Sequence, residues 1–245
     1  MAEKKISNIK FDKTAHQEKI SQRVFLDIEG YNSSKIETVS AIALSEQLTE
    51  AQKKALKKQL KEIYIKYNEL DDTSQEYLAF ITKLFEWAFS NQYFKVYCLG
   101  TTSEFHNTKL KKMMRILKHL LAKQYTKKYL LIAPNKKEGK LFRRRFKTTS
   151  GRRHKKHSYR QIIRKYFRNY RFFTPNKDET VYFYWLVKQI NIAYSKVLKY
   201  ALAEPSEMPR SHKVFYAYTA LLPFISNSDL NETQVFNVDT YTEDR

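Results

Sequence analysis

The sequence predicts an α/β protein in which helices pack on the faces of a mixed β-sheet. Short runs of strand-forming residues alternate along the chain with longer segments whose apolar residues recur every three or four positions. Hydrophobic residues make up 42% of the 245 residues and aromatic residues 15%, a composition that can bury a core. Only four Gly and five Pro imply few tight turns and long regular elements.

The predicted elements alternate in a regular order. Residues 23–28 (RVFLDI) and 36–44 (IETVSAIAL) form two adjacent strands on either side of a turn-like YNSS. A helix follows from Thr49, which has Gln52 at capping-box spacing. The next helix has Thr73 as its expected cap. That helix is expected at 74–89. The remaining elements are a strand at 94–99, a helix with its apolar stripe at 110–121, a strand at 129–133, and helices at 158–170 and 178–200.

Composition divides the chain into a core and its extensions. We expect flexible ends at 1–20 and 226–245, where the sequence is polar. The core begins in 21–134 and is completed by helices in 172–225. Residues 135–171 form a basic loop and helix extension inserted between these two parts.

The surplus positive charge lies in one stretch of the chain. The protein has 46 Lys and Arg against 25 Asp and Glu, a formal net charge of +21. Residues 1–100 contain 15 basic and 14 acidic residues, residues 101–171 contain 24 and 2, and residues 172–245 contain 7 and 9. Such clustering is typical of a protein that binds nucleic acid. A solvated basic loop and a membrane-surface patch are the alternatives, although no long apolar run or lipidation motif accompanies the charge.

Basic and aromatic side chains interleave from Lys140 to Arg171. This stretch has 14 Lys and Arg, no acid, and several Tyr and Phe, so cations for phosphates lie beside rings that can stack on bases. We expect DNA or RNA as the partner, bound largely without sequence preference. The residues predicted to bind it are Arg143, Arg144, Arg145, Lys147, Arg152, Arg153, Lys155, Lys156, Arg160 and Arg164.

Several other classes of protein are not indicated. The single cysteine, Cys98, excludes an intrachain disulfide and a Cys-rich zinc site, and its place in an apolar strand favours a packed thiol over a nucleophile. No signal peptide or membrane span is recognisable, so we expect a cytoplasmic protein. The glycine-rich phosphate-binding motifs are absent.

The sharpest local signal is FLDIEG, which places Asp27 and Glu29 at the exit of the first strand. Because side chains alternate along a strand, both carboxylates are expected on one face. Convergent carboxylates bind Mg²⁺ or Mn²⁺, which in metal-dependent nucleases activates the attacking water. The alternative is an ordinary D-x-E triplet, exposed and unpaired.

The triplet is followed by a second strand and, later, by VYCLGTTSEFHNTKL. In this order of elements the sequence resembles the DEDD superfamily of 3′-to-5′ exonucleases over roughly residues 22–133. The resemblance implies an RNase H-like mixed sheet flanked by helices. It also implies a catalytic, metal-binding set in which Glu104 joins Asp27 and Glu29, with Asp178 as the fourth ligand and Mg²⁺ or Mn²⁺ as cofactor.

The last motif of that family, H-x-x-x-x-D or Y-x-x-x-D on a late helix, is not found at the corresponding place. Glu104 and Asp178 also fit as acids at helix N-termini, where they interact with the helix dipole. The leading interpretation is a metal-dependent 3′-to-5′ exonuclease acting on DNA or RNA. The alternative is a non-catalytic nucleic-acid-binding protein used for protection, packaging or recruitment. A third possibility is an adaptor whose basic surface meets an acidic partner.

Overall fold

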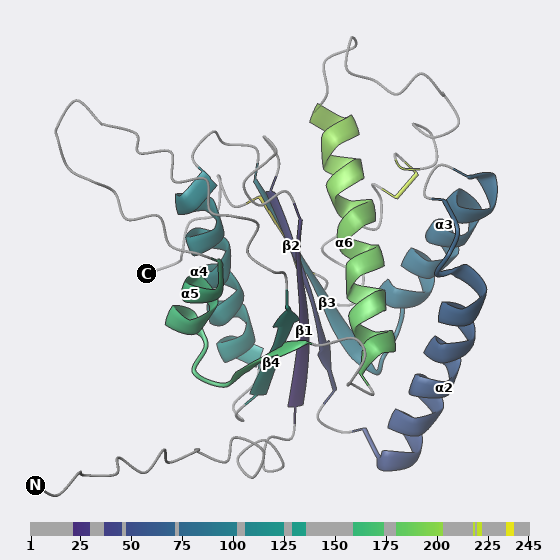
Figure 1. Ribbon diagram of the computed structural model, residues 1–245, viewed down its shortest axis with the longest axis horizontal. Helices are drawn as coiled ribbons and strands as arrows, with labels where there is room; N and C mark the ends of the chain where they lie inside the picture. Colours follow the sequence, from purple (N-terminus) through teal and green to yellow (C-terminus); the bar gives the residue numbers. More distant parts are fainter. Residues whose placement is uncertain are drawn as a thin grey trace, which may run out of the picture.

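A computed structural model of the chain shows an RNase H-like α/β fold, with a six-stranded mixed sheet between two helical layers (Figure 1). The structure describes residues 22–29, 37–45, 48–71, 74–101, 106–124, 129–135, 159–173, 180–202, 218, 220–221 and 234–237.

The sheet has the strand order β5-β4-β1-β2-β3-β6. Its strands are β1 (Gln22–Glu29), β2 (Glu37–Leu44), β3 (Phe94–Thr101), β4 (Tyr129–Pro134), β5 (Tyr170–Phe173) and β6 (Gln234–Asn237). The first three strands form an antiparallel meander. β4 runs parallel to β1, β5 parallel to β4, and β6 parallel to β3. The predicted fold class, a mixed sheet flanked by helices, is therefore confirmed.

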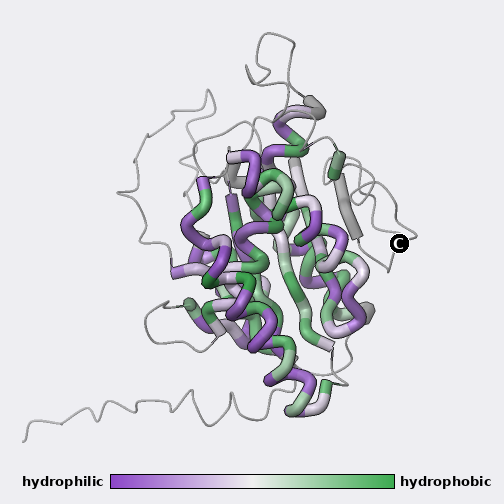
Figure 2. Tube along the Cα trace, turned by 90° about the vertical axis from the view of Figure 1, so that its right-hand side faces the viewer, coloured by the Kyte–Doolittle hydropathy of each residue, from purple (hydrophilic) through white to green (hydrophobic). Residues whose placement is uncertain are grey.

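The helices in the described part of the chain cover the two faces of the sheet. They are α2 (Glu50–Tyr67), α3 (Gln75–Phe89), α4 (His106–Gln124), α5 (Tyr159–Tyr166) and α6 (Val181–Leu202). Figure 1 shows α4 and α5 on one face and α6 on the other, with α2 and α3 beside α6. Seen from that second side, apolar strands lie behind helices that alternate between polar and apolar residues (Figure 2).

The helix starts follow the capping rules with one shift. The predicted capping box is confirmed: the backbone N–H of Gln52 donates to Oγ1 of Thr49 at 3.2 Å, and Oε1 of Gln52 accepts from the backbone N–H of Thr49 at 2.9 Å. The cap of α3 is Ser74 rather than Thr73. Oγ of Ser74 accepts a hydrogen bond from the backbone N–H of Tyr77 at 3.1 Å.

Alternation along the strands divides the core into two clusters. One lies between the sheet and α3 and α6, and includes Phe25 and Ile42. The other lies between the sheet and α4 and α5, and includes Leu26 and Val39. Because successive side chains point to opposite faces, each central strand contributes to both clusters. Figure 1 shows the helical layers under which these clusters lie.

The prediction of a helix at 158–170 is wrong for its C-terminal end. α5 stops at Tyr166, and the aromatic run YRFF forms β5, which pairs with β4. Aromatic residues fit a pleated sheet well, and pairing with β4 overrides the helical periodicity of the preceding residues. Ile162, Ile163 and Phe167 are buried, so part of the predicted basic extension belongs to the core. A second unpredicted strand, β6, lies within the stretch expected to be a flexible tail.

Five of the six described strands end at one edge of the sheet. β1, β3, β4, β5 and β6 run in the same direction, so their C-terminal ends meet at what we call the carboxyl edge. The meander adds strands on one side of β1, whereas β4 and β5 add them on the other. Such a reversal of strand order is where open α/β sheets most often bind ligands.

Candidate functional site

Asp27 lies near the end of β1 on the face covered by α6. In the sheet it pairs with Ser40 of β2, and Ser40 pairs with Cys98 of β3. All three residues are 0% exposed. The alternative of an exposed, unpaired D-x-E triplet is therefore wrong for Asp27, because β1 continues beyond it and α6 covers this face.

Two donors from α6 hold the carboxylate of Asp27. The hydroxyl of Tyr184 donates to Oδ1 at 3.0 Å, and Nδ2 of Asn191 donates to Oδ2 at 3.0 Å. The ring of Tyr184 is itself positioned by stacking on Phe173 of β5, with 4.4 Å between ring centroids. Both carboxylate oxygens thus have a partner, as a buried carboxylate requires.

The hydrogen bonds continue from Asn191 into the sheet. Oγ of Ser40 donates to Oδ1 of Asn191 at 3.0 Å and lies 3.4 Å from Sγ of Cys98. Burial raises the pKa of Cys98 to about 12, so the thiol stays protonated and can donate to Ser40. We call Cys98, Ser40, Asn191, Asp27 and Tyr184 the buried polar chain. The prediction that Cys98 is a packed thiol is confirmed.

Gly100 allows α6 to approach β3 beside this chain. A Cβ at Gly100 would lie 2.8 Å from the hydroxyl oxygen of Tyr194 and in hard contact with the side chain of Leu198. The hydroxyl of Tyr194 is buried, and this burial raises its pKa. The glycine in VYCLG therefore serves close packing between the helix and the sheet.

Glu29 ends β1 two residues after Asp27, and by alternation it shares the face of Asp27. It is partly exposed and pairs in the sheet with Thr38 of β2. Thr38 is buried, and its hydroxyl finds no hydrogen-bond partner among the described residues. The carboxyl edge thus combines a carboxylate with a buried hydroxyl.

A third acid of this edge was missed from the sequence. Glu37 begins β2, is 1% exposed and pairs with Thr101 of β3. Strand alternation puts it on the face opposite Glu29, towards α4. Its position near the start of the run IETVSAIAL was the available signal, because the register of the two strands pairs the next residue, Thr38, with Glu29.

The other two predicted ligands, Glu104 and Asp178, lie outside the described residues. The segments that contain them, 102–105 and 174–179, follow β3 and β5, which both end at the carboxyl edge. Among the residues that the structure describes, no three His, Cys, Asp or Glu come together to hold a metal ion. The set of four metal ligands therefore stays a prediction.

α6 presents an amide and a hydroxyl to Asp27 rather than an acid. No Asp or Glu occurs from Val181 to Leu202. The segment has the sequence pattern of an apolar helix, so Tyr184 and Asn191 were not predicted as site residues. The signal was a polar residue, Asn191, in the middle of a buried stripe that includes Ile190 and Tyr194.

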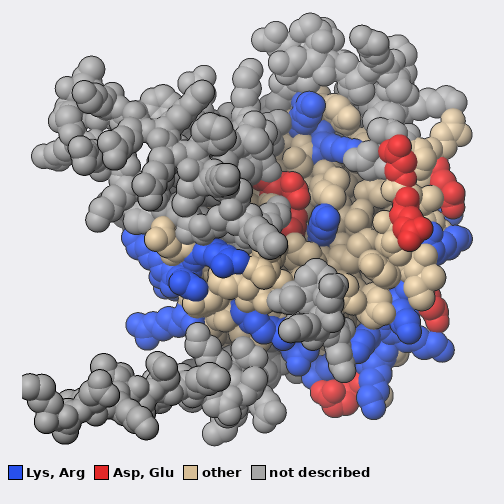
Figure 3. Space-filling view, in the orientation of Figure 1, with Lys and Arg blue, Asp and Glu red and all other residues tan. Residues whose placement is uncertain are grey.

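The opposite face of the sheet is covered by a cationic layer, which we define as α4 together with residues 159–171. By sequence it contains eleven Lys and Arg and no Asp or Glu. Apolar residues of both helices face the sheet, while Lys112, Lys118, Arg164, Lys165 and Arg168 are exposed. Figure 3 shows Lys and Arg on the left, where α4 and α5 lie, and acids mixed with bases on the side of α2 and α3.

Of the ten residues predicted to bind nucleic acid, Arg160 and Arg164 lie on α5 in this layer. The other eight lie outside the described residues, within 136–158. That segment leaves β4 after Asn135 and returns at Tyr159, so it is attached at the start of α5.

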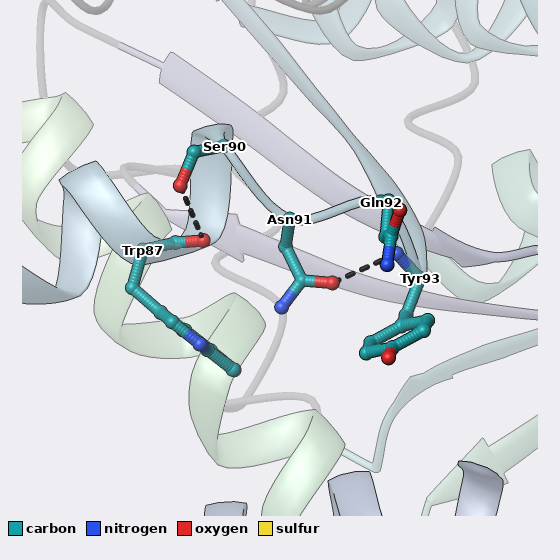
Figure 4. Close-up of a pocket in the computed structure, with 5 residues that line it drawn as sticks. All are labelled: Trp87, Ser90, Asn91, Gln92 and Tyr93. Atoms are coloured by element: carbon teal, nitrogen blue, oxygen red, sulfur yellow. Dashed lines mark hydrogen bonds between the residues drawn. The ribbon is translucent and has the colours of Figure 1, made fainter.

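A shallow depression of about 260 Å³ lies at the other edge of the sheet, where α3 ends and β3 begins. It is lined by Trp87, Ser90, Asn91, Gln92 and Tyr93 (Figure 4). Oδ1 of Asn91 accepts a hydrogen bond from the backbone N–H of Tyr93 at 2.8 Å, so this oxygen is used within the loop. None of the lining residues is an acid or a base that could act on a substrate at neutral pH.

No helix in the described part of the chain has both the length and the apolarity needed to cross a membrane. Comparison with known proteins finds no family model, curated protein or solved structure that matches this chain.

Proposed function

We propose that this protein binds nucleic acid through its cationic layer, without catalysis at the carboxyl edge. The observation that supports the binding most directly is the separation of charge in space. Eleven basic residues share the layer with no acid, whereas the lysines of α2 are mixed with Glu50 and Glu62, and Glu69 follows the helix. An uncompensated field of one sign attracts and holds a polyanion.

The segment 136–158 extends this surface in the proposal. Its eleven further Lys and Arg are attached to the layer through Asn135 and Tyr159. Rings interleaved with the cations favour nucleic acid over an acidic protein partner or a membrane surface, because bases offer faces on which rings can stack.

The non-catalytic form of the proposal is supported by α6. Both oxygens of Asp27 already accept hydrogen bonds from Tyr184 and Asn191, and the helix that covers Asp27 supplies no acid. These bonds already use one acceptor position on each oxygen of Asp27 and fix the orientation of the carboxylate, which leaves it fewer positions for a divalent cation. The described residues therefore fit a polar core better than a metal site.

Binding is expected to depend strongly on salt. If the cationic layer and segment 136–158 contact about 6 to 10 phosphates, affinity for an oligonucleotide should fall by roughly 10³ to 10⁵ between about 50 and 200 mM salt. Changing four exposed cations of the layer to Ala should reduce the slope of log Kd against log salt by about 3 to 4. The four changes are Lys112→Ala, Lys118→Ala, Arg164→Ala and Arg168→Ala.

A matched variant controls for net charge. It replaces four exposed lysines of α2, on the other side of the sheet: Lys54→Ala, Lys58→Ala, Lys61→Ala and Lys66→Ala. Both variants lose the same charge. If binding depends on where the cations lie, the α2 variant should keep the wild-type slope of log Kd against log salt. Equal slopes in the two variants, or binding that ignores salt, would rule out the cationic layer as the binding surface.

A second candidate, a metal-dependent 3′-to-5′ exonuclease, is favoured by one observation. Glu29 is partly exposed at the carboxyl edge beside Thr38, whose buried hydroxyl has no hydrogen-bond partner in the described part of the chain. The segments containing Glu104 and Asp178 begin at this edge. Carboxylates and a hydroxyl are oxygen ligands of the kind that Mg²⁺ and Mn²⁺ prefer.

The two candidates differ in the expected fate of an end-labelled oligonucleotide. The binding proposal expects no cleavage in Mg²⁺ or Mn²⁺. If the protein is an exonuclease, the wild type cleaves the oligonucleotide and Glu29→Gln abolishes the cleavage. Glu62→Gln, the same change of carboxylate to amide on the exposed side of α2, leaves the cleavage unchanged. Glu29 lies outside the buried polar chain, so this variant tests the site without disturbing Asp27. Cleavage at the same rate in both variants would point to a contaminant or another site.

A further inference from the structure

Two partly exposed rings stand side by side on β5, at the edge of the sheet. Tyr170 and Phe172 are two residues apart on the strand, so they share the face next to α5. Their ring centroids are 5.4 Å apart with the planes at 62°. Among the described strands, β5 is the outermost on this side of the sheet and pairs with β4 alone.

An arginine of α5 lies over each ring. Cζ of Arg160 is 4.9 Å from the ring centroid of Phe172, and Cζ of Arg164 is 5.8 Å from that of Tyr170. The side chain of Arg160 also donates a hydrogen bond to Oδ1 of Asn135 at the end of β4. These contacts restrain the guanidinium groups while leaving them N–H groups for phosphates.

We propose that Tyr170, Phe172, Arg160 and Arg164 form a stacking platform for unpaired bases, so that the protein prefers single-stranded nucleic acid. The inference rests on the proposed binding function and specifies its substrate class. Rings and guanidinium planes stack on bases whose faces are exposed, whereas a duplex hides those faces and offers mainly phosphates. The rest of the cationic layer contacts phosphates of either form, and the platform adds affinity for single strands alone.

The platform also has a direction. Arg160, Phe172 and Asn135 lie at the carboxyl edge, and Tyr170 and Arg164 lie further back along β5 and α5. A strand stacked along these residues therefore runs toward the edge at which β1 ends with Glu29.

The test removes the rings and keeps the charge. Tyr170→Leu and Phe172→Leu together preserve apolar packing but abolish stacking. Fluorescence anisotropy with a labelled single-stranded oligothymidylate should show binding about 5- to 100-fold weaker than wild type. Affinity for a duplex of equal length should change by less than about twofold, and the salt slope should stay the same because no cation is removed.

A matched control changes a similar ring on the opposite side of the sheet. Tyr67 of α2 stacks on Phe80 at 4.0 Å and has Nζ of Lys66 5.0 Å from its ring centroid. Tyr67→Leu should leave both affinities unchanged. Photo-cross-linking of wild-type protein to an oligonucleotide containing 5-iodouracil does not depend on the variants folding. It should give adducts on Tyr170 or Phe172.

Failure of the platform can be told apart from failure of the binding function. Equal losses for single strand and duplex, no loss for either, or adducts only outside β5 and α5 would overturn the platform and leave the cationic layer in place. Wild-type protein that binds neither oligonucleotide would overturn both proposals.

Discussion

Asn191→Asp is expected to destabilise the protein strongly at neutral pH and much less near pH 4. In the wild type, Nδ2 of Asn191 donates to Oδ2 of Asp27 at 3.0 Å, and both residues are 0% exposed. The substitution replaces the donor by a second carboxylate. Two buried carboxylates in contact cannot both be ionised, so the folded protein must keep one proton between them.

The cost follows from holding that proton at pH 7. In the unfolded chain the same carboxyl group ionises near pH 3.9, so keeping it protonated at pH 7 costs about 4 kcal/mol. The folded state binds more protons than the unfolded state above about pH 4. Stability is therefore lost as the pH rises from about 4 and is recovered as it falls back. Urea unfolding at pH 4, 5, 6 and 7, compared with wild type at each pH, measures the difference.

The same chemical change two residues earlier on α6 is the control. Gln189 is partly exposed, and its Oε1 accepts a hydrogen bond from the hydroxyl of Tyr77 at 2.8 Å. Gln189→Glu keeps this acceptor and faces no second acid in the contacts described, so it should change stability by less than about 1 kcal/mol. A pH-independent effect of Asn191→Asp, or an equal effect of both changes, would contradict the proposed contact between residues 27 and 191.

The order of elements and the face of Asp27 could be predicted because they depend on local periodicity. Alternation in RVFLDI and IETVSAIAL fixes which side chains share a face, and the pair Thr49 and Gln52 fixes a helix start. β5 could not be found in this way. Its four residues are too few to show a period, and they follow a helix whose apolar spacing continues into them.

The partners of Asp27 could not be predicted because they are distant in sequence. Tyr184 is 157 positions away and Asn191 is 164 positions away. Within α6 both are surrounded by apolar and aromatic residues, so the segment shows only the pattern of a buried helix. The contacts between α6 and β1 depend on how the helix lies across the sheet. Gly100 helps to set this position because it lets α6 pack closely on β3, and no sequence pattern reveals that role.

The position of the cationic layer was predicted only in part. The surplus charge lies in residues 101–171, and the predicted binding residues lie in the loop and on α5. The structure adds α4, because its apolar stripe faces the sheet and therefore turns Lys112 and Lys118 outward beside α5. A charge that is spread over two segments in the sequence becomes one surface through the packing of two helices.

Asp27→Asn is expected to restore most of the stability lost in Asn191→Asp. In the double variant the new amide at position 27 donates to the new carboxylate at position 191, which still accepts from Ser40. The hydroxyl of Tyr184 donates to the amide oxygen at position 27. Every polar group of the buried polar chain thus keeps a partner, and the site again holds one negative charge.

The expected recovery at pH 7 is about 3 kcal/mol, and the abnormal pH dependence should disappear. Asp27→Asn alone should change stability by only about 1 kcal/mol, because its amide can accept from Asn191 and donate to the hydroxyl oxygen of Tyr184. The double-mutant cycle therefore has a large coupling energy, measured by urea unfolding of all four proteins. Additive effects would show that the two side chains are not in contact.

The swapped variant also separates the two candidate functions. It moves the carboxylate from β1 to α6 while preserving the fold, and the cationic layer on the opposite face is untouched. Oligonucleotide affinity should therefore equal that of the wild type. A metal-dependent nuclease that uses Asp27 would instead lose cleavage in this variant, because the ligand would approach the cation from a different element. Unchanged stability and binding with lost cleavage would assign Asp27 to catalysis, whereas wild-type behaviour in all three measurements would assign it to the folded core.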